Sequence, residues 1–161
     1  MEYIEVRKKI ADLSLNDING LAFLPMNFES ANNVEEFVYQ DSLKVVNKLM
    51  KQENIVVKRL EKDLTGTKYY VENDITWIGP TIFIAYSFWT ENPHLISIGL
   101  SVIAGYLTDF FKGKSKSPKV KLEYVLEKNP KKGKKNVRFT YEGDIDGLDK
   151  LPAILKKLKD E

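Results

Sequence analysis

The residue types that most often carry out chemistry are scarce in this sequence. The chain has one histidine, His94, and no cysteine. A serine–histidine–acid arrangement therefore has a single candidate base, and thiolate nucleophiles and thiolate zinc sites are excluded. A lone histidine in a Pro-His turn, with no motif around it, is typical of a surface or helix-capping residue. We therefore expect no catalytic residues, no metal site and no cofactor.

Two groups of carboxylates are candidates for acid–base chemistry or for a Mg²⁺ site. They are Glu35-Glu36 and Asp144-Ile145-Asp146. Neither matches a motif, because the first is typical of the solvent face of a helix and the second of turn and cap residues. The glycine-rich phosphate-binding patterns G-x-G-x-x-G and G-x-x-x-x-G-K-[ST] do not occur.

The loop at residues 26–39 is a candidate ligand site. It follows a predicted strand, and in open α/β sheets ligands bind beyond the carboxyl ends of the strands. Amide, carboxylate and hydroxyl side chains are available there: Asn27, Glu29, Ser30, Asn32 and Asn33. An ordinary connecting loop is the alternative interpretation, and it is the one that base rates favour.

Positive charge is concentrated behind the centre of the chain. Residues 112–138 contain eleven lysines or arginines against two glutamates, whereas residues 1–50 contain eight acids against five bases. Phosphate contact, with nucleic acid or anionic lipid, is one interpretation, with four loop lysines as candidates: Lys131, Lys132, Lys134 and Lys135. Because Tyr124 is the only aromatic residue in this region, a solvated hairpin loop is favoured over nucleic-acid binding.

The apolar stretch at residues 75–111 is predicted to be the structural centre. Gly79-Pro80 and Asn92-Pro93 divide it into two helices, since proline is tolerated at the first position of a helix. Its uncharged runs, 75–90 and 92–108, are 16 and 17 residues long. A membrane-spanning helix takes about twenty residues, so a buried helical hairpin is favoured over a membrane-inserted one.

The second of these helices is expected to be buried on all sides, because apolar residues surround it. Three small residues spaced by four form a stripe along it: Ser97, Ser101 and Gly105. Such a stripe allows close approach of a neighbouring helix, from this chain or from another.

The first part of the chain, residues 1–74, is predicted to hold a strand–helix–strand unit behind a short amphipathic helix at 3–13. A buried strand is expected at 21–24, and a helix begins after Asp41 or Ser42. A second strand at 55–60 makes the unit a parallel crossover. We expect residues 68–71 to form a further strand, paired with the previous one as a hairpin.

The last part, residues 119–161, changes to a period of two. Residues 120–126 and 137–141 alternate between apolar and polar side chains, which predicts an antiparallel hairpin. An amphipathic helix follows, with Asp146 as its predicted cap and a start nearer Lys150, since Pro152 lies too deep for a regular helix begun at the cap.

Taken together, these patterns predict one compact α/β or α+β domain over residues 1–161. Hydrophobic residues make up 43% and charged residues 30%, which argues against disorder. The absence of cysteine and of an apolar leader favours the cytoplasm, with membrane association as the alternative.

The favoured function is a non-catalytic interaction or regulatory protein that contacts a protein partner or a second copy of itself. The first alternative is a small-ligand binder or enzyme that uses the 26–39 loop. The second is a membrane-associated accessory protein that inserts the 75–111 hairpin.

Overall fold

Two β-sheets and five α-helices make up the part of the chain that the computed structural model describes, which is residues 2–71, 76–113, 119–133 and 136–160. The large sheet has the strand order β1-β8-β7-β6-β2-β4, and β3 pairs with β5 in a small one. The strands are β1 Glu2–Tyr3, β2 Leu21–Leu24, β3 Val38–Gln40, β4 Val57–Lys58, β5 Lys68–Tyr70, β6 Thr76–Ile84, β7 Lys119–Glu127 and β8 Asn136–Gly143. The helices are α1 Val6–Asp12, α2 Leu43–Gln52, α3 Tyr86–Glu91, α4 Pro93–Phe110 and α5 Leu151–Asp160. Three short 3₁₀ helices connect them: η1 Val34–Glu36, η2 Pro130–Lys132 and η3 Ile145–Lys150.

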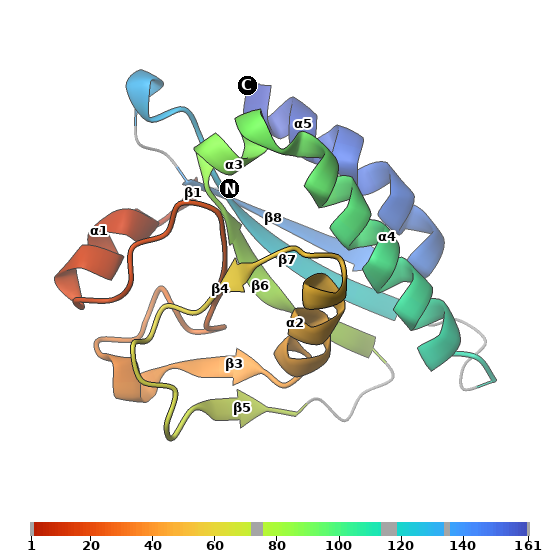
Figure 1. The fold of residues 1–161 in the computed structure, drawn as a ribbon, viewed down its shortest axis with the longest axis horizontal. Helices are drawn as coiled ribbons and strands as arrows, with labels where there is room; N and C mark the ends of the chain where they lie inside the picture. The colour runs from red at the N-terminus through yellow and green to blue at the C-terminus, as the bar shows by residue number, and fades with distance from the viewer. Residues whose placement is uncertain (1, 72–75, 114–118, 134–135, 161) are drawn as a thin grey trace.

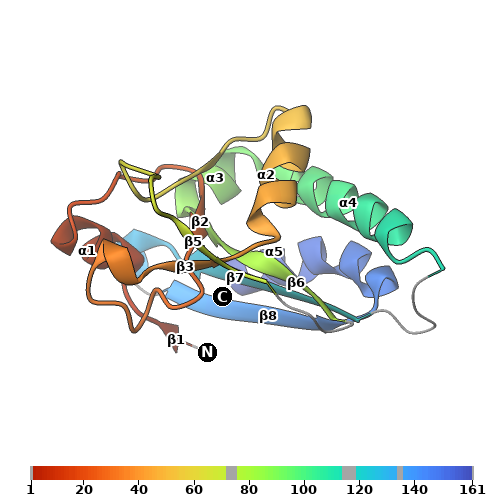
Figure 2. The same ribbon diagram turned by 90° about the horizontal axis from the view of Figure 1, so that it is seen from below.

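Helices α2, α4 and α5 lie on one face of the large sheet (Figure 1, Figure 2). The longest, α4, contacts α2 on one side and α5 with η3 on the other. The buried apolar side chains of all these elements belong to one hydrophobic cluster. The class predicted from the sequence, a mixed α/β fold, is therefore confirmed.

The N-terminal strand–helix–strand unit is present as predicted. Strand β2 runs parallel to β4, with Leu21 opposite Val57, and α2 connects them. Helix α2 buries one face through Leu43, Val46 and Met50. The hairpin expected at residues 68–71 is wrong, however, because β5 pairs in parallel with β3 and leaves β4 at the edge of the large sheet.

The first half of the central apolar stretch is a strand, which corrects the helix predicted from Pro80. Strand β6 requires a glycine at position 79, because a Cβ there would lie 2.6 Å from Leu122 and 3.0 Å from the ring of Trp77. Pro80 falls where the pairing of β6 with β7 shifts register, between Ile78 and Thr81. At such an irregularity a residue without an N–H group is tolerated inside a sheet. The helical pair of the centre is thus α3 and α4, divided at Asn92-Pro93 as predicted.

Helix α4 is buried on one face only, which corrects the prediction of a helix buried all round. Ile96, Leu100, Ile103 and Leu107 form the buried face. Helix α2 packs against α4 at Gly99, where a Cβ would lie 3.3 Å from the sulfur of Met50. None of the helices in the described segments combines the length and apolar character needed to cross a bilayer.

The C-terminal unit has the predicted form. Strands β7 and β8 pair antiparallel from Val120 opposite Gly143 to Glu127 opposite Asn136, and α5 follows. The cap differs from the prediction, because the Asp144 side chain, not that of Asp146, accepts from the backbone N–H of Gly147 at 3.1 Å. Residues 114–118, between α4 and β7, lie outside the described residues.

Candidate functional site

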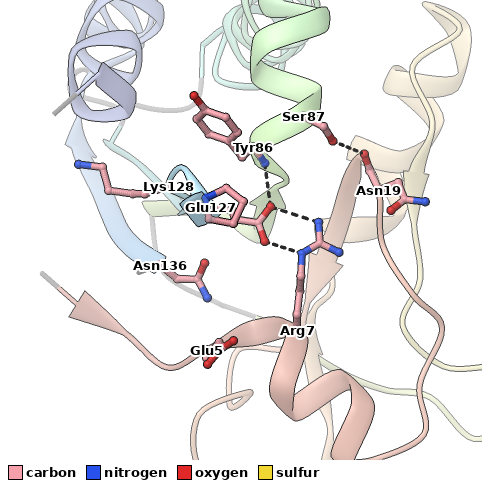
Figure 3. Close-up of a pocket in the computed structure, with 9 residues that line it drawn as sticks. Glu5, Arg7, Asn19, Tyr86, Ser87, Glu127, Lys128 and Asn136 are labelled. Atoms are coloured by element: carbon pink, nitrogen blue, oxygen red, sulfur yellow. Dashed lines mark hydrogen bonds and ion pairs between the residues drawn. The ribbon is translucent and has the colours of Figure 1, made fainter. Parts of the chain in front are cut away.

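A cavity of about 310 Å³ lies at the carboxyl ends of β6 and β7 (Figure 3). These two strands are neighbours and run parallel, so both end at the same edge of the sheet, which is where α/β proteins commonly bind ligands. Five separate chain segments supply its lining: Glu5, Arg7, Asn19, Tyr86, Ser87, Glu127, Lys128, Pro130 and Asn136. We call this cavity the strand-end pocket.

The centre of the strand-end pocket is an ion pair between Arg7 of α1 and Glu127, the last residue of β7. Arg7 Nε donates to one carboxylate oxygen, and Nη2 donates to the other at 3.1 Å (Figure 3). The backbone N–H of Tyr86, the first residue of α3, also donates to Glu127 at 3.0 Å. The hydrogen bonding of Arg7 to the Glu127 carboxylate raises the pKa of Arg7. This bidentate contact locks α1, β7 and α3 together around the cavity.

Arg7 is held at its other nitrogen as well. Its Nη1 donates to the carbonyl of Ile18 at 2.6 Å, in the segment before β2. Both oxygens of Glu127 are already acceptors, and the side chain is only 13% exposed. The pair therefore forms a fixed wall of the strand-end pocket.

Asn136, the first residue of β8, contributes a deeply placed polar group. The residue is 5% exposed, and its Nδ2 donates to the carbonyl of Ile4 at 3.0 Å. Only an amide nitrogen can donate to a carbonyl, so this bond fixes the side chain with Oδ1 turned toward Glu127 (Figure 3). No described residue donates a hydrogen bond to Oδ1.

The rim of the strand-end pocket combines a hydroxyl and a cation. The Ser87 hydroxyl donates to the carbonyl of Asn19 at 3.2 Å, which keeps the segment before β2 close to α3. The ammonium group of Lys128 has no hydrogen-bond or ion-pair partner in the described part of the chain. Among the described residues of the lining, Glu5 and Glu127 are acidic and Arg7 and Lys128 are basic.

The candidate ligand residues of the 26–39 loop lie elsewhere and stabilise the loop itself. Asn27 donates to the carbonyl of Glu36 at 2.7 Å and accepts from the N–H of Val38 at 3.0 Å. Glu29 forms an ion pair with Arg138 at 3.0 Å. The backbone N–H of Asn32 donates to the Glu36 carboxylate, and Asn33 precedes η1 without a capping side-chain bond. Ligand binding by these residues stays a prediction, and none of them lines the strand-end pocket.

The loop lysines are placed only in part. Lys131 and Lys132 lie exposed on η2, whereas Lys134 and Lys135 fall outside the described residues. Contact with an anion or with nucleic acid at these positions stays a prediction.

His94 is exposed in the first turn of α4, beside a second cavity of about 310 Å³ between α4 and α5. Ser97 and two lysines, Lys156 and Lys159, also line that cavity, and none of its described lining residues is a carboxylate. The described residues therefore do not form a serine–histidine–acid arrangement around this histidine.

Sequence reasoning missed the strand-end pocket because its residues are far apart in the chain. Arg7 and Glu127 are separated by 120 positions, so no local spacing connects them. One signal of the pocket was present in the sequence at Glu127, the last residue of a strand with alternating apolar and polar side chains. In α/β sheets, ligands bind beyond the carboxyl ends of the strands.

Comparison with known proteins gives no indication of the function. The chain matches no protein-family model, no curated protein and no solved structure. Its function is accordingly inferred from the chemistry of the strand-end pocket and of the exposed surfaces.

Proposed function

We propose that this protein is a non-catalytic binding protein whose ligand is a small polar molecule held in the strand-end pocket. The observation that carries the proposal is the convergence of five chain segments on one cavity at the ends of two parallel strands. Its volume is at the lower end of the range for small-molecule sites, about 300–1,000 Å³, so the ligand is small.

The chemistry of the lining favours binding over catalysis. A general base needs a free acceptor beside its substrate. The two oxygens of Glu127 instead accept three hydrogen bonds from Arg7 and Tyr86. Asn136, Ser87 and Lys128 remain to contact a ligand, and these groups recognise polar molecules without reacting with them.

The test is a ligand screen with a variant that fills the strand-end pocket. The probes are free amino acids, aldoses, nucleosides and small carboxylic acids, followed by backbone amide NMR and by thermal unfolding. A ligand at one hundred times its Kd stabilises the fold by about 2.7 kcal/mol, which raises Tm by about 5–10 °C. We expect one of these classes to do so and to shift the amide signals of Ser87 and Lys128.

Ser87→Tyr should abolish this response because the new ring occupies the cavity. Thr90→Tyr is the matched control, since Thr90 is exposed on the same helix and does not line the strand-end pocket. The proposal fails if none of the probes at millimolar concentration shifts these signals, or if Ser87→Tyr leaves the response intact.

A second candidate function, contact with a second copy of the chain, is favoured by the outer face of α4. Ser97, Ser101 and Gly105 are all exposed there, and the position of a Cβ on Gly105 is open space. No charged residue occurs from 92 to 108, and Ile98 is 37% exposed. A two-fold axis would place two such small-residue stripes against each other.

Sedimentation velocity over a range of protein concentrations tests this second candidate. We expect the wild-type chain to form a dimer and Ser101→Arg to remain monomeric, because the substitution places a large charge in the centre of the contact. Gln52→Arg adds the same charge at an exposed site on α2 and should leave the dimer unchanged. A wild-type chain that stays monomeric at every concentration excludes the contact.

A further inference from the structure

We propose that the cavity of about 310 Å³ between α4 and α5 binds a small phosphorylated molecule through its phosphate group. We call this cavity the interhelix pocket. It is separate from the strand-end pocket, since no described residue lines both. Its volume is at the lower end of the range for small-molecule sites, about 300–1,000 Å³. The observation that points to a ligand is a buried N–H donor, on Trp89, with no acceptor in the described part of the chain.

This donor is Nε1 of Trp89, on α3. Trp89 is 2% exposed and lines the interhelix pocket. Its Nε1 is shielded from solvent and has no hydrogen-bond partner among the described residues. A buried polar atom without a partner is costly, and an indole nitrogen can only donate. A ligand that brings an acceptor oxygen into the cavity would complete this group.

The other polar side chains of the interhelix pocket can donate hydrogen bonds as well. The imidazole of His94 keeps an N–H group in either protonation state, and Ser97 has a hydroxyl. Lys156, on α5, is exposed and forms no hydrogen bond or ion pair within the described segments. None of the described lining residues is a carboxylate. A negatively charged acceptor therefore finds donors on three helices, α3, α4 and α5.

The start of α4 adds to this positive environment. The helix is 18 residues long, begins at Pro93, and has no side-chain hydrogen bond capping its first turn. The N-terminal end of a helix carries about half an elementary positive charge and is a common site for phosphate groups. His94 and Ser97 place this end of α4 at the wall of the interhelix pocket.

The arrangement of the donors favours a phosphate over a carboxylate. Trp89, His94 and Lys156 approach the cavity from three different helices. A phosphate monoester presents three acceptor oxygens and a charge of about −1.5 to −2 at pH 7, whereas a carboxylate has two oxygens in one plane and a single charge. The carbon part of the ligand would lie against the apolar residues of the lining, which are Pro93, Ile96, Pro152 and Ala153.

Lys159 is the flexible neighbour of the indole. Its ammonium group lies 6.0 Å from the centre of the Trp89 ring, and it lines the same cavity. A long lysine side chain can turn toward a bound anion and open the path to Nε1. Because Lys159 has another interaction partner as well, Lys156 is the lysine that we expect to supply the charge for the phosphate.

The test is an NMR titration at constant ionic strength with glycerol 3-phosphate, inorganic phosphate, glycerol and potassium chloride. The readout is the indole N–H signal of Trp89. It is identified as the signal that remains in Trp77→Phe or disappears in Trp89→Phe, because the chain has two tryptophans. We expect glycerol 3-phosphate and inorganic phosphate to shift this signal, and chloride to leave it in place. Glycerol 3-phosphate should bind at least tenfold more tightly than glycerol.

Lys156→Met removes the cation but keeps an unbranched side chain, and we expect it to weaken glycerol 3-phosphate binding at least tenfold. Lys157→Met is the matched control, because Lys157 is exposed next to it on α5 and does not line the cavity. Ser87→Tyr, which fills the strand-end pocket, should also leave this binding unchanged.

Any of four results overturns the inference. Glycerol could bind as tightly as glycerol 3-phosphate, or the Trp89 indole signal could stay in place while glycerol 3-phosphate binds. Lys156→Met could keep wild-type affinity. Loss of glycerol 3-phosphate binding in Ser87→Tyr would place the phosphate in the strand-end pocket instead.

Discussion

Three side chains, Tyr39, Arg59 and Glu61, form a polar cluster that joins β3 to the segment after β4. Tyr39 is fully buried, and its hydroxyl donates to Glu61 at 2.5 Å. The Arg59 guanidinium lies 4.5 Å from the centre of the Tyr39 ring and 3.6 Å from the other oxygen of Glu61. Because Glu61 is only 7% exposed, its charge is tolerated through these contacts, and removing any one of them should be costly.

The pH dependence of stability reports on this cluster. Burial and the bond to Glu61 raise the pKa of Tyr39 above its usual value of 10. Below pH 10 both the folded and the unfolded chain keep the phenolic proton. Above it the unfolded chain releases the proton first, so the free energy of unfolding falls by about 1.4 kcal/mol per pH unit on account of this one residue.

Tyr39→Phe should therefore flatten the alkaline loss of stability by that amount. At neutral pH the variant should be about 1–3 kcal/mol less stable, because Glu61 loses a buried donor. Urea denaturation at pH 8, 10 and 11 measures both effects. Tyr70→Phe, at a residue 46% exposed, is the control and should follow the wild-type curve. Parallel curves for Tyr39→Phe and wild type would contradict the pKa shift.

At the scale of elements, hydrophobic periodicity predicted helices and strands well where one face of the element is buried and the other is exposed to solvent. The alternation in β7 and β8 and the spacing of Leu43, Val46 and Met50 in α2 both placed their elements correctly. Each pattern has a defined period, 2.0 or 3.6, that a single window of sequence contains.

Strand β6 shows why the central stretch could not be assigned in the same way. Six of its nine residues in succession, Gly79–Ile84, are buried, so no period marks the run as a strand. Gly79 and Pro80 resemble the start of a helix locally. Their actual roles, room for Trp77 and Leu122 and a place at a register shift, depend on β7, which lies about forty residues further on.

The pairing of β3 with β5 and the strand-end pocket were hidden for the same reason. A parallel pair needs partners far apart in sequence, and the pocket needs Arg7 and Glu127, which are separated by 120 positions. Neither of these long separations in sequence produces a short, regular residue spacing that could be recognised. The residue types alone identify Arg7 and Glu127 as ordinary surface charges, and only the fold makes them partners.

At the scale of the whole molecule, the N-terminal and C-terminal units share one core. Strand β6 pairs with β2 of the first unit on one side and with β7 of the second on the other. The strand-end pocket is also built from both units, since α1 of the first unit meets the ends of β6 and β7 there. A site assembled in this way exists only when both units are folded and joined.

This architecture predicts that the chain unfolds in a single cooperative step. The two tryptophans report on different elements, Trp77 on β6 and Trp89 on α3, and both are buried. In Trp77→Phe the fluorescence follows only Trp89, and in Trp89→Phe it follows only Trp77. For each variant we expect the fluorescence curve in urea to overlay the circular-dichroism curve, with an m-value of about 1–3 kcal/mol per molar urea.

The midpoints of the two variants can differ, because each substitution has its own cost in stability. A fluorescence transition that separates from the circular-dichroism transition within one variant would show that the units unfold independently, and the pocket between them would then lack the rigid walls that binding requires.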